Sequence, residues 1–249
     1  MPERIWQVLI ADLKSSRELS ARERAVVERA LRRAILQTLR FHGARFRMIP
    51  ELLRGDELQA VLRPEAPALT ILTYLRARLA TAAGRRVELR AGIGRGAIQR
   101  LSPRGPFASD GPAFHRARAA LERARQAGGP RRTGWQTGDQ RFDDLADAVL
   151  GLTDACGTRW TLPQWEAVAG RIEGKGLHAI ARGERVAFQS VSKRLRAASW
   201  NEVEAAFQLL ELQSLGIEGD GVPAPRERVR PAARAAADPA VRGAPASKG

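Results

Sequence analysis

The first half of the chain is best understood from one apolar stretch, Ile5-Trp6-Gln7-Val8-Leu9-Ile10-Ala11-Asp12-Leu13. It is apolar, partly β-branched and too short for a buried helix, so it predicts a buried strand with a carboxylate near its end. Ser20 and Glu23 follow with the spacing of a capping box, and apolar residues then recur at helical intervals. A helix is therefore predicted after the strand, ending near Gly43.

The rest of the first half continues with strands and helices. The predicted elements are strands at 45–49 and 57–62, a helix from 64 to about 83, a strand at 86–93 and a helix from 112 to about 126. This order predicts an α+β domain of ferredoxin-like topology over residues 1–130. The string Gly92-x-Gly94-x-Gly96 lacks the helix of a strand–helix–strand unit, so it does not predict a dinucleotide site.

The second half is predicted to be all-helical over residues 141–215. Candidate helices lie at 141–155, at 162–173, at 176–182 together with 186–198, and at 200–214. Residues 219–249 consist mainly of proline, alanine, glycine and arginine with almost no large apolar side chains. We expect them to form a disordered tail, since they offer too little surface to bury.

Composition excludes several classes of protein. Among 249 residues there is one cysteine, Cys156, so neither a disulfide framework nor a cysteine-based zinc site fits within the chain. The longest uncharged run of the first half, 66–75, is too short to cross a bilayer, which excludes an integral membrane protein. Because no secretory signal is recognisable, we expect a cytoplasmic protein without a membrane partner.

Basic residues are concentrated in the first half. The formal net charge is +15, and residues 1–127 carry 25 basic against 12 acidic side chains. Such a field attracts nucleotides, nucleic acids or other polyanions. A solvated arginine-rich surface without a specific partner is the alternative interpretation.

A candidate phosphate site follows the first strand. Asp12 stands near the strand end, and Lys14, Ser15, Ser16 and Arg17 come directly after it. Backbone N–H groups, two hydroxyls and cations at the entry to a helix suit a phosphate group. These four residues are therefore predicted to bind phosphate.

A candidate metal site lies beside it. Asp56 and Glu57 stand at the tip of the hairpin whose arms neighbour the first strand. We predict that Asp12, Asp56 and Glu57 hold Mg²⁺, which takes carboxylate and phosphate oxygens as ligands. Two metal ions there would allow phosphoryl or nucleotidyl transfer. In the alternative interpretation Asp12 caps a turn, and Gly55-Asp56 serves only as turn residues.

Four strings in this order carry a resemblance to a known family: IADLKSSRELSARE, LLRGDELQAVL, LRAGIGRGAI and ASDGPAFHRARAAL. They resemble the SatD family of bacterial proteins, and the likeness covers most of residues 5–200. The first half in turn resembles the palm of class III nucleotidyl cyclases and GGDEF cyclases, through Asp12 with its loop, Gly55-Asp56-Glu57 and the stretch 90–96. The resemblance implies a nucleotide partner with Mg²⁺, and a homodimer.

One departure from the cyclases bears on turnover. Class III cyclases carry an asparagine, and an arginine four residues later, on the helix after the last core strand. Here that helix begins Pro112-Ala113-Phe114-His115-Arg116-Ala117-Arg118 and has no asparagine. Groups that stabilise charge on the transferred phosphate are therefore missing, and we expect binding with little or no cyclisation.

The stretch 177–195 resembles a helix-turn-helix of the sigma-factor and MarR type. Its second helix presents the predicted DNA-binding residues Gln189, Ser190, Ser192, Lys193 and Arg194. Glutamine and arginine pair with base edges, and serine and lysine with phosphates.

The turn of this motif departs from the usual pattern. Glu184 and Arg185 stand where a Leu-Gly pair is usual, and Ala187 stands where serine or threonine usually begins the second helix. A three-helix packing module that only resembles a DNA-binding domain is the alternative.

Two functional hypotheses follow, with an adaptor protein lacking both activities as a third. The first is a SatD-like regulatory protein that binds a nucleotide, with Mg²⁺, in its first domain and DNA through its second. The alternative is a nucleotidyl cyclase or nucleotidyltransferase that uses Asp12 and Asp56 as metal ligands.

Overall fold

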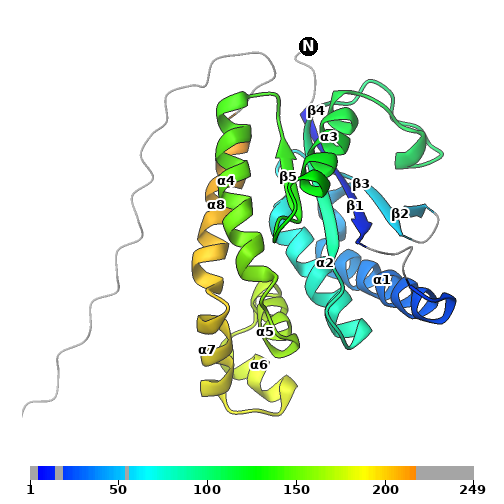
Figure 1. Ribbon diagram of the computed structural model, residues 1–249. Coiled ribbons are helices and arrows are strands. Elements are labelled where there is room, and N and C mark those ends of the chain that lie inside the picture. Colours follow the sequence, from blue (N-terminus) through cyan, green and yellow to red (C-terminus); the bar gives the residue numbers. More distant parts are fainter. Residues whose placement is uncertain (1–4, 15–18, 54–55, 217–249) are drawn as a thin grey trace, which may run out of the picture.

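The computed structural model describes residues 5–14, 19–53 and 56–216, and Figure 1 shows their arrangement. The first half forms β1 (Ile5–Leu13), α1 (Ala21–His42), β2 (Phe46–Leu53), β3 (Glu57–Leu62), α2 (Ala68–Ala83), β4 (Leu89–Ala97) and α3 (Pro112–Gln126). Then follow β5 (Thr133–Gln136), α4 (Gln140–Gly157), α5 (Leu162–Ile172), α6 (Leu177–Glu184), α7 (Phe188–Ala197) and α8 (Trp200–Leu215).

The sheet has five strands in the order β2-β3-β1-β4-β5. Its first four strands pair antiparallel, and β5 runs parallel to β4. The predicted α+β, ferredoxin-like order is therefore confirmed for the first four strands. The fifth strand was not predicted, because Thr-Gly-Trp-Gln is too short to show an alternating pattern.

The first helix, α1, begins with the capping box that the sequence predicts. The Ser20 hydroxyl accepts a hydrogen bond from the backbone N–H of Glu23, and the Glu23 carboxylate accepts one from the N–H of Ser20. This hydrogen bonding lowers the pKa of Glu23. The reciprocal bonds satisfy backbone donors that a helix start otherwise leaves unpaired.

Three elements differ in extent from the prediction. The strand expected at 45–49 begins at Phe46 and continues to Leu53. The helix expected from Pro64 begins at Ala68, because the carbonyl groups of Pro64 and Ala66 accept hydrogen bonds from the buried Gln7 amide instead of starting a helix. The strand expected at 86–93 runs from Leu89 to Ala97, through the glycine-rich string.

The two faces of the sheet have separate apolar layers. On one face Leu9 and Ala11 pack into a core shared with Leu31 of α1 and Leu72 of α2. On the other face the layer is formed by Val8, Ile10, Val61, Ala113, Phe114, Ala117 and Leu121, and α3 covers it. Successive side chains of β1 thus enter opposite layers, as the pleat of a strand requires.

The glycine-rich string allows α3 to lie directly on the sheet backbone. A Cβ atom at Gly92 would lie 2.1 Å from the Ala117 carbonyl oxygen, and one at Gly94 would lie 2.1 Å from that of Ala113. Both separations are far below van der Waals contact, so any side chain there would push α3 away. Close helix packing explains these two glycines without a ligand.

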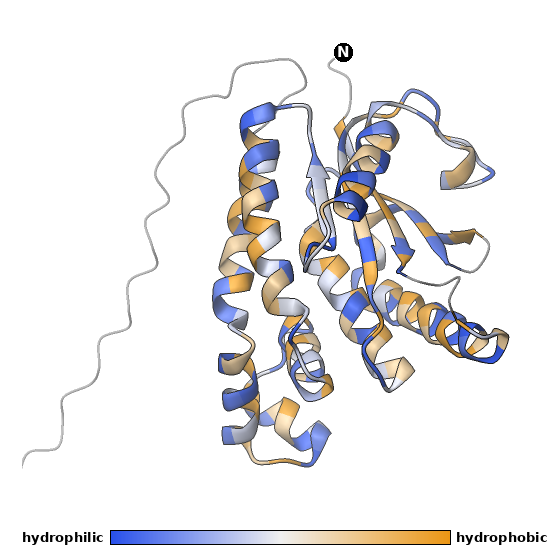
Figure 2. Cartoon of the chain, viewed as in Figure 1, coloured by the Kyte–Doolittle hydropathy of each residue, from blue (hydrophilic) through white to orange (hydrophobic). Residues whose placement is uncertain are grey.

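The second half packs onto the first through a continuous core. Trp135 of β5 meets Phe142 of α4 edge to face, with ring centroids 5.3 Å apart. Trp160, Trp165 and Trp200 form a buried aromatic cluster within the same core as the α1 and α2 residues. In Figure 1, α4 and α8 run side by side along one flank, and Figure 2 shows apolar and polar residues alternating along them. Within the part of the chain that the structure describes, no helix is both long and apolar enough to cross a membrane.

Candidate functional site

The candidate site lies where β1 ends. Asp12 is the cross-strand partner of Glu57 on β3 and of Arg90 on β4. Since side chains two apart share a face, Asp12 lies on the face of Val8 and Ile10, which α3 covers. Asp12, Glu57 and Arg90 therefore form a row of charged residues across three adjacent strands, next to the apolar layer under α3.

Arg125 of α3 reaches this row and pairs with Asp12. Its Nη2 and Nε atoms lie 2.9 and 3.2 Å from Oδ2 of Asp12. The other carboxylate oxygen, Oδ1, is buried and has no hydrogen-bond partner among the residues that the structure describes. Burial lowers the pKa of Arg125, but the hydrogen bonds and charges of Asp12 and Glu122 outweigh it and raise this pKa overall.

The other predicted metal ligands lie next to Asp12. The backbone carbonyl of Asp56 accepts a hydrogen bond from the N–H of Leu13 at 3.2 Å, so the hairpin tip adjoins the end of β1. The Glu57 carboxylate lies 3.5 Å from the guanidinium of Arg118. The tertiary structure thus brings Asp12, Asp56 and Glu57 to one end of the sheet, and their joint role as metal ligands stays a prediction.

The fit of Mg²⁺ can be judged from the donors present. Across the described residues, no group of three or more histidine, cysteine, aspartate or glutamate side chains is arranged to hold a metal ion. Asp12 Oδ1 is a buried oxygen with an open lone pair, which is the donor that Mg²⁺ prefers. The residues therefore fit an ion that is held by Asp12 together with phosphate oxygens, and they do not fit a cage made by protein alone.

Of the predicted phosphate residues, only Lys14 falls in the described part of the chain. Ser15, Ser16 and Arg17 lie outside the described residues. The Lys14 ammonium lies 3.0 Å from the carboxylate of Glu88, and its backbone N–H donates to the Glu88 carbonyl at 2.9 Å. The turn before β4 therefore holds Lys14 in place.

Glu88 lies at the centre of a cluster of three basic side chains. Arg86 and Arg132 approach its carboxylate to 2.9 and 2.8 Å, in addition to Lys14. Burial raises the pKa of Glu88, but hydrogen bonds from Arg86 and Lys14 and the charge of Arg132 outweigh it and bring this pKa to about 2. The carboxylate stays ionised and orients three cations around it.

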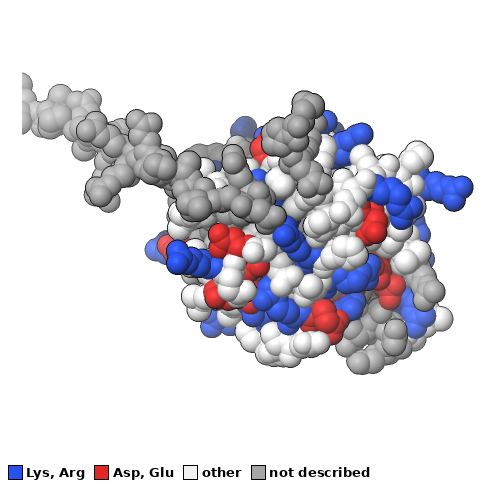
Figure 3. Space-filling model, turned by 90° about the horizontal axis from the view of Figure 1, so that it is seen from above, with Lys and Arg blue, Asp and Glu red and all other residues white. Residues whose placement is uncertain are grey.

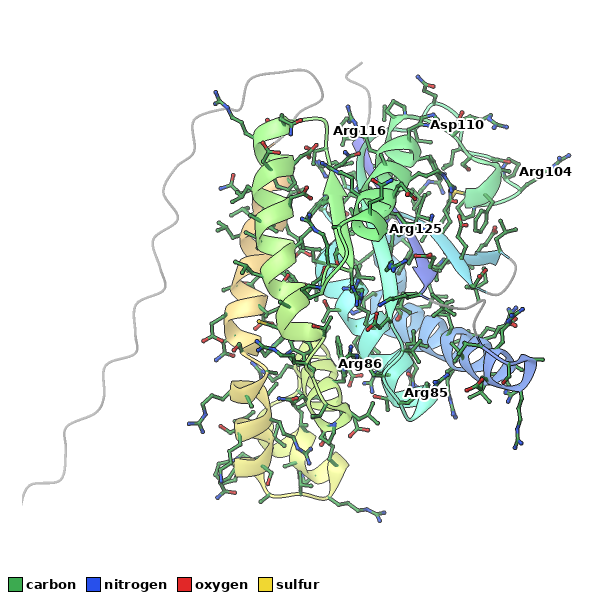
Figure 4. The ribbon with its side chains drawn as sticks, viewed as in Figure 1. Arg85, Arg86, Arg104, Asp110, Arg116 and Arg125 are labelled. Atoms are coloured by element: carbon green, nitrogen blue, oxygen red, sulfur yellow. The ribbon has the colours of Figure 1, made fainter. Side chains whose placement is uncertain are left out.

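A cavity of about 230 Å³ opens beside Lys14. Its walls are formed by Leu13, Lys14, Leu19, Val27, Arg85, Arg86, Val87 and Glu88. Figure 4 shows Arg85 and Arg86 below the sheet, at the connection between α2 and β4, and Arg125 on α3 near the end of β1. Lys14, Arg85 and Arg86 therefore gather on the α1 and α2 side of the sheet, where Leu13 and Val27 also lie. Arg125 and Asp12 lie on the opposite side, which α3 covers, and do not line this cavity.

Sequence reasoning did not identify Arg85, Arg86 or Arg125 as site residues. Arg85 and Arg86 follow the helix-ending Gly84, and Arg125 stands in the last turn of α3. No local motif marks them, because they reach the site through the packing of α2 and α3 around the sheet. Figure 3 shows that basic and acidic side chains are intermixed on the face seen from above.

The predicted DNA-binding region forms two short helices joined by residues 185–187. Arg185 adopts φ 56°, the left-handed conformation that usually requires glycine. Ala187 starts α7 without a side-chain cap. Gln189 and Lys193 are exposed, and Ser190 and Ser192 are half-buried.

Arg194 has a structural partner. Its guanidinium forms an ion pair with the Glu184 carboxylate at the end of α6. Burial and the neighbouring Glu166 raise the pKa of Glu184, and Arg194 opposes them only in part. Arg194 thus links α6 to α7, and the helix-turn-helix interpretation stays a prediction.

Comparison with known proteins found one family model and several solved structures. A family model described as the SatD family matches residues 6–201. No curated protein matches. Among solved structures, the guanylyl cyclase Cya2 is similar at 14% identity and TM-score 0.38, over 49% of this chain and 72% of that chain.

A bacterial light-regulated adenylyl cyclase is similar at 14% identity and TM-score 0.42, over 65% of this chain and 83% of that chain. Both TM-scores lie below 0.5, so nothing about this chain is concluded from these two structures. The family match is of a different kind, since it spans most of the chain, from β1 to the start of α8. The protein therefore belongs to the SatD family.

Proposed function

We propose that the protein binds a nucleoside triphosphate at the end of β1 and acts by binding rather than by turnover. The observation that carries this proposal is the cavity that Lys14, Arg85 and Arg86 line. A triphosphate needs several cations and backbone donors in a concave site, and each charge-assisted hydrogen bond is roughly twice as strong as a neutral one. In this proposal the three cations hold the phosphates.

Mg²⁺ would enter with the nucleotide. Asp12 does not line the cavity, so the triphosphate would have to extend around the end of β1 to bring its oxygens to the α3 side of the sheet. There Asp12 Oδ1 would supply one ligand to the ion, and phosphate oxygens would supply others. Bound there, the ion would offset the charge between the carboxylate and the phosphates. Arg125 binds Oδ2, so an ion held by Oδ1 would share the carboxylate with this guanidinium.

The position of His115 supports binding without turnover. His115 lies in the first turn of α3, the helix on which class III cyclases carry an asparagine that this chain lacks, and it lies 3.2 Å from Asp110, which precedes the helix. Arg125, which marks the Asp12 site, comes ten residues later on the same helix. Ten residues correspond to about 15 Å along a helix, so His115 and Asp12 of one chain do not act on the same phosphate.

The test is nucleotide binding by the full chain, measured by thermal shift and calorimetry with each nucleoside triphosphate, with and without Mg²⁺. A ligand at 100 times its Kd stabilises the folded state by about 2.7 kcal/mol. Lys14→Ala and the double change Arg85→Ala and Arg86→Ala should weaken binding tenfold or more. Arg104→Ala is the matched control, because Figure 4 places Arg104 on a distant loop.

The enzyme alternative is tested in the same samples. Labelled triphosphates are incubated with the protein and Mg²⁺ or Mn²⁺, and the products are separated. Formation of a cyclic mononucleotide or a dinucleotide that Asp56→Ala abolishes would make the protein a nucleotidyl cyclase or nucleotidyltransferase. Absence of nucleotide binding under all conditions would refute the proposal.

DNA binding is the second candidate, and the exposed row on α7 favours it. Gln189, Lys193 and Arg196 are exposed and spaced four and three residues apart, so they share one side of the helix. Such a row suits a groove of duplex DNA. Binding to duplex DNA that falls as salt rises would support a regulatory role, and its absence at low salt would remove it.

A further inference from the structure

The outer surface of α4 and α8 carries an apolar stripe, which we call the α4–α8 stripe. It consists of Leu145, Ala148, Leu152 and Ala155 on α4, and Ala205, Leu209, Leu212 and Leu215 on α8. Leu152 is 72% exposed, and Leu145, Leu209 and Leu212 are each about half exposed. Figure 1 shows the two helices side by side on the flank away from the sheet.

The stripe lacks exposed charge, although 28% of all residues are charged. Asp147 of α4 forms ion pairs with Arg123 and Arg131. Asp154 is buried, and its carboxylate accepts a hydrogen bond from the backbone N–H of Thr133. On α8, Glu211 points to α2, where it accepts hydrogen bonds from the backbone. Contiguous exposed apolar surface of this kind marks an interface.

The spacing of the stripe is that of a helix–helix seam. Its α4 members follow one another at intervals of three, four and three residues, and Ala205, Leu209 and Leu212 follow at four and three. Alternation of three and four keeps one narrow line of side chains toward a partner helix. A partner of helical form therefore fits the stripe better than a strand or a small molecule.

We infer that the partner is a second copy of this chain, with its α4 antiparallel to the first. Along α4 the stripe alternates large and small: Leu145, Ala148, Leu152, Ala155. A two-fold axis that crosses α4 at the level of residue 150 places Leu145 opposite the second copy's Ala155, and Leu152 opposite its Ala148. Each leucine then meets an alanine, which is the interdigitation that close packing requires.

Charges at the ends of the stripe agree with this direction. Asp144 and Arg159 are exposed and flank the stripe at opposite ends. In the antiparallel arrangement the second copy's Arg159 stands level with Arg141, and Asp144 lies three residues from that level, so this one carboxylate is within one helical turn of both arginines. A parallel arrangement would instead set Asp144 against Asp144 and each leucine against a leucine.

This inference does not rest on the proposed function, and its test is the mass of the full chain in solution. Sedimentation equilibrium from about 1 to 100 μM should give twice the chain mass of 27.2 kDa. Leu152→Glu should weaken the dimer at least 100-fold, because it buries a charge at the centre of the seam. Leu36→Glu is the matched control, since Leu36 is a 68% exposed leucine on α1 and lies outside the stripe.

Two further variants test the antiparallel register. Ala148→Leu alone sets leucine against Leu152 of the second copy and should weaken the dimer at least tenfold. The exchange Ala148→Leu with Leu152→Ala restores one leucine against one alanine and should restore dimerisation. A monomer at every concentration, a dimer that Leu152→Glu leaves intact, or an exchange that fails to restore the dimer would each overturn the inference.

Discussion

The guanidinium of Arg125 on α3 donates two hydrogen bonds to one oxygen of Asp12 on β1, and the second oxygen of Asp12 stays buried without a partner. The carboxylate predicted to hold Mg²⁺ is therefore shared with an internal cation. Any metal ion at Asp12 approaches Oδ1, or it displaces Arg125. If Mg²⁺ binds there as proposed, its affinity will depend on a residue that lies 113 positions away in the sequence.

We expect Arg125→Ala to increase the response to Mg²⁺. Without the guanidinium, Asp12 keeps a buried negative charge with no ion pair, and a divalent cation can satisfy it. Thermal melts should show the variant less stable than the wild type without Mg²⁺, by about 1–3 kcal/mol, and more strongly stabilised by its addition. Arg104→Ala is the control, and an identical Mg²⁺ response in Arg125→Ala and the wild type would contradict this prediction.

Gly94→Ala should strongly destabilise the fold. The new Cβ would lie 2.1 Å from the Ala113 carbonyl oxygen, so α3 must move away from β4. Overpacking of this kind costs about 1–3 kcal/mol, occasionally more. Urea unfolding measures the cost, with Gly43→Ala as the control because a Cβ at Gly43 meets nothing within 4 Å. Equal midpoints for the two variants would show that α3 adapts freely.

Stability should fall between about pH 4.5 and 7 because of Glu211. Its carboxylate accepts hydrogen bonds from the N–H groups of Leu69 and Thr70, which lower its pKa, but burial dominates and raises that pKa to about 7. The folded state therefore holds the proton more tightly than the unfolded chain, so stability is greatest below the unfolded pKa and falls as pH rises to about 7.

Glu211→Gln tests this origin of the pH dependence. The amide keeps an acceptor oxygen and stays neutral, so the loss of about 3 kcal/mol expected for the wild type over this window should vanish. Denaturant unfolding at pH 5 and pH 8 measures it, and Glu202→Gln is the control at an exposed position on the same helix. A pH profile that Glu211→Gln leaves unchanged would assign the effect to another group.

Lys193→Ala and Arg194→Ala should have different effects if α7 binds DNA. Lys193 is exposed, so its loss should reduce the salt slope of DNA binding by about one and leave stability unchanged. Arg194 pairs with Glu184, so its loss should lower the melting temperature because a half-buried carboxylate is left alone. Melting curves and binding titrations at several salt concentrations separate the two effects.

The local elements of the first half follow from the sequence because their signals lie within a few residues of one another. The apolar run of β1, the capping box at Ser20 and Glu23, and the helix end at Gly84 each act over one turn or one strand. The same holds for the helices of the second half, whose apolar spacing predicts them. The order of these elements then limits the sheet to few topologies.

Contacts between distant segments could not be predicted in this way. β5 becomes a strand because β4 offers it a parallel edge, and Gly92 and Gly94 are needed because α3 lies on them. Arg125 reaches Asp12 only because α3 crosses the end of β1. Each of these contacts depends on where two segments meet after folding.

From the amino-acid sequence we could therefore derive the secondary elements other than β5, their order and the resemblance to the family, and the positions of Asp12, Asp56 and Glu57 near strand ends. The tertiary structure alone decided which cations surround Asp12, which of the predicted residues are occupied by ion pairs, and which face of α4 and α8 stays exposed. The difference comes from the distance along the chain over which each interaction acts. Propensity and capping act between neighbours in the chain, whereas burial and ion pairing depend on distances in space that only the packed fold sets.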